Sequence, residues 1–446
     1  MSDKPVSQPN GLDQLLVTYR DPDWSARLHQ IRQAVRLAAY FEDGSPEDTQ
    51  LGNILKEVRT HKDQALSEYT LRFDGVTLRP EEFRVSAQAL EKAHRQVETA
   101  DRGLLASLRL AIENVRRYQA EIFVADKIRH PGVRYTPIER VGVCVPGASA
   151  PLPSTVIMTA VPAQVAGVKE IAVVSPPRNQ GSIHPMILAV CHELGISEVY
   201  RIGGAHAVAA LAYGTETIRP VHKIVGPGNN WVQMAKRKVF GQVDIDSIAG
   251  PSEVLIIANC RVNPAWTAAD MLSQAEHAPG SAVVFTDSLD LARKVLAELK
   301  DQTGRLTRSD RTRACLEQFS AIIVFAGLEE AVAAANEFAP EHLEIQCGDA
   351  SRDIAGRIRN AGAIFIGSHS PVAVGDYWAG PSHTLPTGQT AKFFSPLSSN
   401  DFVKSSSIIE YDRETLAKAA GDIIRLARAE GLDAHARSIE IRQEDR

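Results

Sequence analysis

The sequence predicts an α/β fold with two doubly wound, incomplete Rossmann-like parallel-sheet domains and helical extensions at both ends. Two observations lead to this prediction. Short apolar runs typical of buried parallel strands alternate with helical segments from residue 140 to 250 and again from 250 to 390. Residues 23–125 and the charged stretch after Asp412 instead carry a helical pattern almost throughout.

The amino-terminal part is expected to be an arm followed by helices. Residues 1–40 form the arm and a first helix, and residues 1–20 are largely polar. Ser45-Pro46-Glu47-Asp48 places a capping residue before a proline in the first helical turn, and Ser86 begins a second helical run. A helical apolar stripe then follows at Leu104, Leu105, Leu108, Ala111, Ile112 and Val115.

The central part alternates between strands and helices. Expected strands are 140–146, 171–175, 198–202, 222–226, 254–258, 282–285, 321–325, 343–345 and 363–366. Expected helices are 154–165, 183–194 and 267–277, with others beginning at Ala205, Asn229, Leu289 and Leu328. We expect one α/β domain from residues 41–140 with 250–390, a second from 141–249, and a helical tail over 391–446.

Composition favours small-molecule chemistry. The net charge of −5 arises from 49 basic and 54 acidic residues, so no field of one sign indicates nucleic acid or an acidic membrane as a partner. We expect neither a secretion signal nor a membrane span, since no apolar run approaches the necessary length. The five cysteines, Cys144, Cys191, Cys260, Cys315 and Cys347, contain no C-x-x-C pair, which favours reduced thiols in the cytoplasm.

Two glycine turns are candidate anion sites. Gly203-Gly204-Ala205 and Gly226-Pro227-Gly228-Asn229 each follow a short strand and open a helix, where backbone N–H groups and the helix dipole can receive a dinucleotide phosphate. Neither matches G-x-G-x-x-G, and tight turns without a ligand are the commoner explanation of such segments.

Gln274 and His277 are candidate metal ligands on the helix expected at 267–277. The apolar stripe comprises Ala268, Met271, Leu272 and Ala275, while Gln274 and His277 lie three residues apart on another side. Such a pair can supply two corners of a metal site if distant segments supply the others. The alternative is a solvated helix face.

Further candidates lie in the carboxy-terminal third. Glu341-His342 precedes an expected strand, where the carboxylate and the imidazole could divide base and acid roles; a solvated turn is the alternative. The long segment 373–388 contains Asp376, a possible oxygen ligand or helix cap, and His383, a possible substrate contact or surface imidazole. Glu430 and His435 lie in the charged tail, where a solvated helix is the default. Together Gln274, His277, Asp376 and His435 form an N/O ligand set that suits zinc and would also accept manganese or cobalt.

At this point the ordered motifs identify a family resemblance. They are Pro146-Gly147 with 150–156, Gly203-Gly204-Ala205, Gly226-Pro227-Gly228-Asn229, 249–254, Ser273-Gln274-Ala275-Glu276-His277, Pro340-Glu341-His342-Leu343, Gly375-Asp376-Tyr377 and Leu432-Asp433-Ala434-His435. From about residue 20 to 440 the chain closely resembles the histidinol dehydrogenase family of zinc enzymes, which complete histidine biosynthesis.

The resemblance implies two NAD-linked oxidations that convert L-histidinol through L-histidinal to L-histidine. Gln274, His277, Asp376 and His435 would hold zinc, which positions the substrate, and residues 141–249 would bind NAD. His342 would be the base for the alcohol, and Glu341 would activate water for the aldehyde. The substrate would be contacted by Ser252, Gln274, His277, His342, Asp376, His383, Glu430 and His435, and NAD by Asn229. The family also implies a homodimer in which each carboxy-terminal tail crosses to the other subunit.

Two positions depart from the family pattern. Many members have Tyr where this chain has Cys144 and Gln where it has His206, both associated with cofactor contact. A thiol lacks the ring surface of Tyr, and an imidazole replaces a flexible amide. Three alternatives to histidinol oxidation therefore stay open: a related zinc and NAD dehydrogenase of another polar alcohol, a zinc hydrolase that uses Glu341 to activate water, and a structural metal-binding protein.

Overall fold

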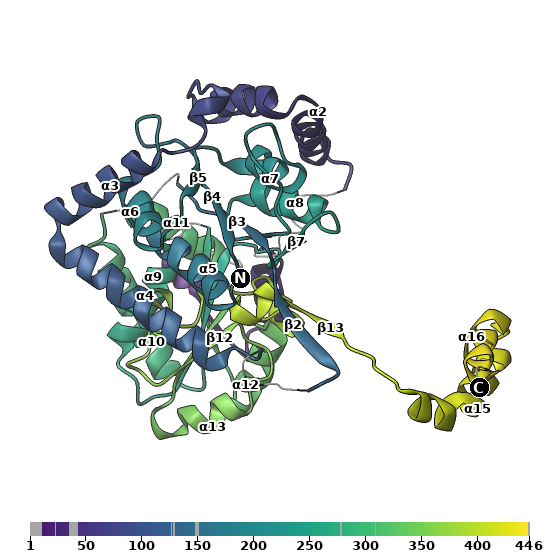
Figure 1. The fold of residues 1–446 in the computed structure, drawn as a ribbon. Helices are drawn as coiled ribbons and strands as arrows, with labels where there is room; N and C mark the ends of the chain where they lie inside the picture. The colour runs from purple at the N-terminus through teal and green to yellow at the C-terminus, as the bar shows by residue number, and fades with distance from the viewer. Residues whose placement is uncertain are drawn as a thin grey trace. The chain divides into compact units, whose positions relative to one another are not determined.

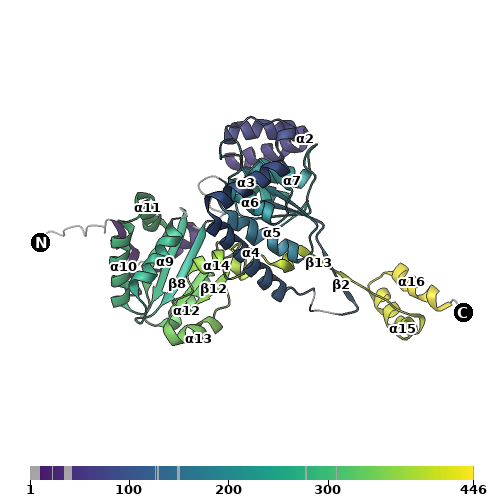
Figure 2. The same ribbon diagram turned by 60° about the vertical axis from the view of Figure 1, so that its left-hand side comes forward.

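The computed structural model describes residues 11–22, 24–34, 43–125, 127, 130–147, 151–276, 279–307 and 309–444 (Figures 1 and 2). The chain divides into two units. The first comprises Met1–Phe123 with Pro137–Phe402, and the second comprises Val124–Thr136 with Val403–Arg446. All the expected α/β structure lies in the first unit, which contains two parallel sheets.

The smaller parallel sheet follows the doubly wound pattern predicted for residues 141–249. Its strands are β3 (Arg140–Cys144), β4 (Glu170–Val174), β5 (Glu198–Tyr200), β6 (Lys223–Val225) and β7 (Asp244–Ile245), in the order β5-β4-β3-β6-β7. The connecting helices are α5 (Pro153–Val165), α6 (Pro185–Glu193), α7 (Gly204–Tyr213) and α8 (Asn230–Val239). The chain reverses its direction of winding between the neighbouring strands β3 and β6, and ligands of such sheets bind outside the carboxyl ends of the strands at this point.

Three amino-terminal helices pack on this smaller sheet. They are α2 (Pro46–Asp74), α3 (Ala87–Ala100) and α4 (Arg102–Ile122), and they contact α7, α6 and α5 respectively. Ser45 and Ser86 cap α2 and α3 as predicted, each accepting a backbone hydrogen bond in the first turn. This packing differs from the expected grouping of 41–140 with 250–390, because the apolar face of α2, including Leu51 and Leu66, shares a core with α7. The boundaries near residues 140 and 250 stay a prediction.

The larger sheet is formed by the second half of the chain and one amino-terminal strand. Its strands are β1 (Leu16–Thr18), β8 (Ser252–Ala258), β9 (Gly280–Thr286), β10 (Ala321–Val324), β11 (His342–Gln346) and β12 (Ala363–Ile366), in the order β1-β10-β9-β8-β11-β12. Neighbouring strands pair in parallel. The winding reverses between β8 and β11.

Helices cover both faces of the larger sheet. One core contains side chains of α9 (Pro264–Ala275), α10 (Leu289–Thr303) and α11 (Ser309–Phe319). The opposite core contains side chains of α1 (Trp24–Ala34), α12 (Leu328–Phe338) and α13 (Ser351–Gly356). Figure 2 shows β8 between α9 and α12. Alternate residues of β8 enter opposite cores, Val254 and Ile256 on the α9 side and Leu255 and Ile257 on the other, as expected for a strand buried on both faces.

Several short elements were not predicted. They include β1, β7, α11, α13, α14 (Val372–Tyr377) and the 3-10 helices η1 (Gly11–Leu15), η3 (Pro80–Glu82), η4 (Gly348–Ala350), η5 (Thr390–Lys392) and η6 (Ser399–Phe402). The strand β1 pairs with β10, so part of the expected amino-terminal arm is an edge strand of the larger sheet. Most of these segments are too short for a periodic pattern to develop.

The second unit contains a strand pair and a helical hairpin. β2 (Val133–Pro137), whose last residue belongs to the first unit, pairs with β13 (Val403–Ser407). α15 (Arg413–Ala429) and α16 (Asp433–Glu444) pack on each other, and Asp412 caps α15. The tail is therefore helical from Arg413, as predicted, but β13 precedes it. In the part of the chain that the structure describes, no helix has both the length and the apolar composition needed to cross a membrane.

Candidate active site

The catalytic candidates lie where β8 and β11 begin. Ser252 is the first residue of β8 and His342 the first of β11. The two strands are neighbours in the sheet, with His342 opposite Val254. Parallel packing therefore brings the 252–253 and 341–342 segments together at the amino edge of the sheet, opposite to the edge where such sheets usually bind ligands.

Glu341 is a buried carboxylate held by two donors. The Ser252 hydroxyl donates to Glu341 Oε2 at 2.7 Å, and the Glu253 backbone N–H donates to the same oxygen at 2.8 Å. The residue is 6% exposed. Two donors on one oxygen fix the carboxylate in orientation and leave Oε1 for other contacts, so Glu341 is no solvated turn residue.

The His342 ring is oriented by the same segment. Its Nδ1 lies 3.1 Å from the Glu253 carbonyl oxygen, which can only accept, so Nδ1 carries the hydrogen. Nε2 is then the basic nitrogen of the neutral ring. It is buried, has no hydrogen-bond partner among the described residues, and lies 3.9 Å from Asp376 Oδ1. In the neutral form of the ring, Nε2 is therefore the nitrogen that can take up a proton.

The charges around His342 determine its protonation. Burial alone lowers the pKa of this imidazole, but the negative charges of Glu341 and Asp376 outweigh burial and raise the pKa to about 9. Burial and the charge of Glu341 raise the pKa of the neighbouring Glu253 carboxyl to about 8. A cation bound at Asp376 would oppose the protonated form of His342 and favour the basic one.

Asp376 and His383 also belong to this cluster. Asp376 lies on α14, and its negative charge acts on the buried His383 imidazole, raising the pKa of that ring against the larger effect of burial. His383 Nε2 lies 3.5 Å from the Thr155 hydroxyl at the start of α5, and burial lowers the pKa of this imidazole. The segment 373–388 thus begins as a short helix and returns to the site, as a functional loop would.

Gln274 lies in the last turn of α9 and is buried. It is 3% exposed, and its Nε2 has no partner in the described part of the chain. A Cβ atom on Gly280 would lie 2.3 Å from the Gln274 carbonyl oxygen and 3.6 Å from its Nε2. Gly280 is paired in the sheet with Ser252, so Gln274 lies at the same edge as the catalytic pair.

Three predicted site residues are not placed with the others. His277 lies outside the described residues. The helix α9 (Pro264–Ala275) begins three residues before the predicted 267–277 and ends two residues before its end. Glu430 and His435 belong to the second unit, where Glu430 is the C-cap of α15, His435 is in the first turn of α16, and both are exposed. Their roles stay predictions.

Glu253 was not among the predicted site residues. Besides its backbone contacts, its Oε1 accepts the N–H groups of Gly388 at 3.0 Å and Glu341 at 3.3 Å. The sequence signal for a role of Glu253 is a charged residue at the second position of the strand β8, which is apolar from Val254 onward. Glu253 therefore links the catalytic pair to the end of the 373–388 segment.

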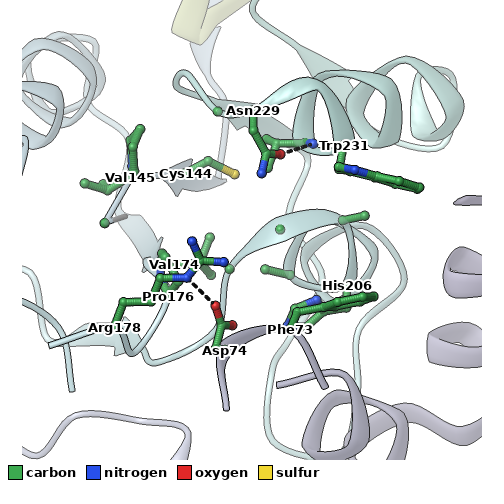
Figure 3. Close-up of a pocket in the computed structure, with 18 of the residues that line it drawn as sticks. Phe73, Asp74, Cys144, Val145, Val174, Pro176, Arg178, His206, Asn229 and Trp231 are labelled. Carbon is green, nitrogen blue, oxygen red and sulfur yellow. Dashed lines mark hydrogen bonds and ion pairs between the residues drawn. The ribbon is translucent and has the colours of Figure 1, made fainter. Parts of the chain in front are cut away.

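A separate pocket lies at the carboxyl edge of the smaller sheet (Figure 3). Its volume is about 590 Å³, within the range of small-molecule sites. Segments 144–147, 203–207 and 227–229 line it, which follow β3, β5 and β6 and include both predicted glycine turns. The pocket thus lies at the point where the winding of the sheet reverses, the position expected for a dinucleotide.

Asn229 is fixed at the rim of this pocket. It is the N-cap of α8, and its Oδ1 accepts the Val232 backbone N–H at 3.2 Å. Arg178 and Asp74 form an ion pair at 2.7 Å on another wall (Figure 3). The pocket therefore combines a helix amino terminus with charged groups, which suits a phosphate-containing ligand.

His206 and Cys144 are both part of the pocket wall. The His206 ring lies 6.0 Å from Tyr69 and 5.9 Å from Phe73 between ring centres, and neither ring nitrogen has a partner in the described chain. Burial lowers the pKa of His206 to about 3 and raises that of Cys144 to about 12, so both groups are neutral. The two departures from the family pattern thus lie at one cavity, beside an aromatic cluster of Tyr69, Phe73 and His206.

A second cavity of about 540 Å³ adjoins the first. It shares Gly228, Asn229 and Trp231 with the pocket of the smaller sheet, and it is also lined by 249–251 and Pro279. Residues 249–251 lead directly into Ser252. The two cavities therefore extend from the smaller sheet toward the catalytic pair.

Comparison with known proteins agrees with these features. The family profile described as histidinol dehydrogenase matches residues 42–443. The histidinol dehydrogenase of Rhodopirellula baltica is 49% identical over 397 residues, covering 88% of this chain and 85% of that protein. The Geobacillus kaustophilus protein of the same name is 46% identical over 426 residues, covering 94% and 99%.

A crystal structure of histidinol dehydrogenase from Elizabethkingia anophelis matches with a TM-score of 0.87. It is 32% identical in sequence and covers 98% of this chain and 99% of that one. Both the sequence and the fold therefore match over nearly the full length. The chain belongs to the histidinol dehydrogenase family.

Proposed function

We propose that this chain oxidises L-histidinol through L-histidinal to L-histidine, the last step of histidine biosynthesis, using NAD and one zinc ion per subunit. The observation that carries the proposal is the pair formed by His342 and Glu341. The imidazole is oriented through Nδ1 and leaves Nε2 without a partner among the described residues, and the carboxylate is fixed by Ser252 and Glu253. Together with the family membership, this pair argues against a structural metal-binding protein and a hydrolase.

The two oxidations need two different bases. His342 Nε2 would take the hydroxyl proton of histidinol while the carbinol hydride passes to NAD. Glu341 would take a proton from the water that adds to the aldehyde, and a second hydride then passes to a second NAD. In total, alcohol, water and two NAD⁺ yield carboxylate, two NADH and three protons.

The NAD assignment is supported by the pocket beyond β3 and β6. Its glycine turns, the amino terminus of α8 and the capped Asn229 suit a pyrophosphate-containing ligand. The adjoining cavity leads toward Ser252, so the nicotinamide would enter from this side. Asn229 would contact NAD. Cys144 and His206, which also line this pocket, would give the cofactor a contact surface different from the Tyr and Gln found in many members of the family.

The donor set of the site fits zinc. Gln274 is buried with an unpartnered amide, Asp376 offers a carboxylate beside the basic nitrogen of His342, and His277 and His435 would add two imidazoles. Amide, carboxylate and imidazole ligands suit zinc, although manganese and cobalt would also be accepted. The metal would supply a positive centre that grips the amine and imidazole of the substrate. Ser252, His383 and Glu430 would contact the substrate.

A homodimer with exchanged tails would complete the site. The α15–α16 hairpin exposes apolar side chains, among them Leu426, which is 66% exposed, and Leu432 and Ile441. Such side chains are expected to be covered by a partner. We propose that His435 and Glu430 act in the site of a second copy, and that the enzyme is cytoplasmic, in keeping with five free cysteines.

The test is to count NADH per histidinol with and without a chelator. We expect two NADH per histidinol, loss of turnover on chelation and recovery with zinc. One NADH with accumulating histidinal would overturn the two-step proposal. A panel of polar alcohols at equal concentration tests substrate choice, because preference for another alcohol would favour a related dehydrogenase instead.

A further inference from the structure

A second group of polar side chains, two of them buried and one half-buried, lies behind the site. Asp270 belongs to α9, and Glu344 and Gln346 belong to β11. Glu344 and Gln346 alternate with apolar residues on the strand, so both lie on the same face as His342. None of these three side chains has a role in the proposed reaction.

The amide of Gln346 is at the centre of the group. It accepts the Thr267 hydroxyl at Oε1, at 3.0 Å, which sets the orientation of the amide. Its Nε2 donates to Asp270 Oδ2 at 2.7 Å and to Glu344 Oε2 at 2.8 Å. Both amide N–H groups and the amide oxygen of Gln346 therefore have partners inside the protein.

The two carboxyl groups lie close together, because one nitrogen, Gln346 Nε2, donates to both. At so short a separation one of the two is expected to carry a proton. Burial raises the pKa of both, and burial with the charge of Asp270 raises the pKa of Glu344 to about 8. Glu344 Oε1 also accepts the Val372 backbone N–H at 3.0 Å, where α14 begins.

Asp270 and Glu344 each lie one structural repeat from a side chain of the site, and so does Val372, whose N–H binds Glu344. Asp270 is one helical turn before Gln274 on α9, and Val372 is one turn before Asp376 on α14. Glu344 is two residues after His342 on the same face of β11. The hydrogen-bonded group thus joins α9, β11 and α14 directly beneath Gln274, His342 and Asp376.

We propose that Asp270, Glu344 and Gln346 are positioning residues that hold α9, β11 and α14 in the register that brings Gln274, His342 and Asp376 to one site. This inference rests on the proposed zinc site. Groups of this kind, which orient metal ligands from behind, typically change metal affinity or activity by about 10- to 100-fold when they are altered.

Two nearly isosteric substitutions separate this role from a general loss of stability. The two oxygens of Glu344 accept one N–H group each, from Gln346 and from Val372. A glutamine at this position can accept at its oxygen only, so in Glu344→Gln one of these two N–H groups must face the amide nitrogen. In Asp270→Asn, the amide oxygen can still accept from Gln346 while the amide nitrogen donates to Glu344. We therefore expect Glu344→Gln to break the group and Asp270→Asn to preserve it.

The experiment measures zinc affinity by competition with a chelator, together with kcat and KM for histidinol. We expect zinc binding by Glu344→Gln to weaken by about 10- to 100-fold, with a rise in KM, and Asp270→Asn to stay within about threefold of the native protein. Ser320→Ala is the control for lost stability, since Ser320 is buried and accepts the Ala282 N–H just before β10, three strands away from β11 in the sheet. It should lower the melting temperature without changing zinc affinity.

The outcomes are distinguishable. Equal zinc affinity in Glu344→Gln and Asp270→Asn would overturn the positioning role, whereas a native protein that binds no zinc would overturn the proposed site itself. If Glu344→Gln does not fold, Thr267→Val removes the hydroxyl that orients Gln346 and should weaken zinc binding in the same direction. Unchanged zinc binding in that variant would equally refute the inference.

Discussion

Replacing Glu341 with glutamine should separate the two oxidations. Ser252 and the Glu253 N–H both donate to Oε2, so the oxygen of the new amide is expected to take that position. The amide nitrogen then replaces Oε1 and cannot accept a proton from water. General-base catalysis contributes about 10²- to 10⁴-fold, so aldehyde oxidation should slow by that factor.

The same substitution should spare alcohol oxidation. The charge of Glu341 is the largest influence that raises the pKa of His342, so its removal lowers that pKa and keeps Nε2 unprotonated at lower pH. The pH profile of the first oxidation should therefore shift toward acid while its maximum rate changes little.

The assay supplies histidinol and histidinal separately and follows NADH. With Glu341→Gln we expect about one NADH per histidinol, with histidinal accumulating, and a melting temperature close to that of the native protein. Equal loss in both half-reactions, without unfolding, would refute the division of labour between the two residues.

Three further predictions concern other positions. His342→Asn should slow histidinol oxidation by about 10²- to 10⁴-fold and histidinal oxidation much less, measured with each substrate. Burial lowers the pKa of His206 to about 3 in the folded protein, whereas the imidazole has its ordinary pKa of 6.5 in the unfolded chain. As the pH falls below 6.5, the unfolded chain therefore binds a proton that the folded protein does not, and the free energy of unfolding decreases. The decrease is about 2 kcal/mol at pH 5, and urea unfolding of His206→Gln should not show it. The same dependence of the free energy of unfolding on pH in both proteins would disprove this prediction. Gly280→Ala should lower stability by about 1–3 kcal/mol and weaken zinc binding, because its Cβ would strike the Gln274 carbonyl, whereas Gly356→Ala, with no atom within 4 Å, should do neither.

Most strands and helices of the two sheets could be predicted from the sequence. Strands such as β8 and β9 are long apolar runs, and Ser45 and Ser86 are unambiguous caps, so local chemistry alone defines these elements. The strand β1 could not be predicted, because three residues gain strand structure only by pairing with β10, some 300 residues later.

The packing of α2 to α4 shows another limit. An apolar stripe indicates that one face of a helix is buried but does not indicate against which partner. The helices α2 to α4 pack on α7, α6 and α5 of the smaller sheet and not on the helices of the larger sheet. The same limit applies to Asp270 and Glu344, whose carboxyl groups meet only through tertiary packing. The alternation of Glu344 and Gln346 with apolar residues is the one sign of this group in the sequence, because polar side chains are uncommon in a strand buried on both faces.

Glu341 and His342 could be chosen as a candidate catalytic pair because they are adjacent in the chain and resemble the family motif. The sequence could not show that Ser252 and Glu253 hold the carboxylate, since that depends on the pairing of β8 with β11. Nor could it show that His206 stacks beside Tyr69 and Phe73. These contacts join segments separated by more than 80 residues in the chain.

The most direct test is a crystal structure of the protein grown with zinc and histidinol, with the metal located by its anomalous scattering. The account predicts one ion per subunit at about 2.0–2.2 Å from Gln274, His277 and Asp376, with His435 supplied by a second copy of the chain and His342 Nε2 facing the substrate hydroxyl. An ion bound elsewhere, or a histidinol hydroxyl remote from His342, would contradict it.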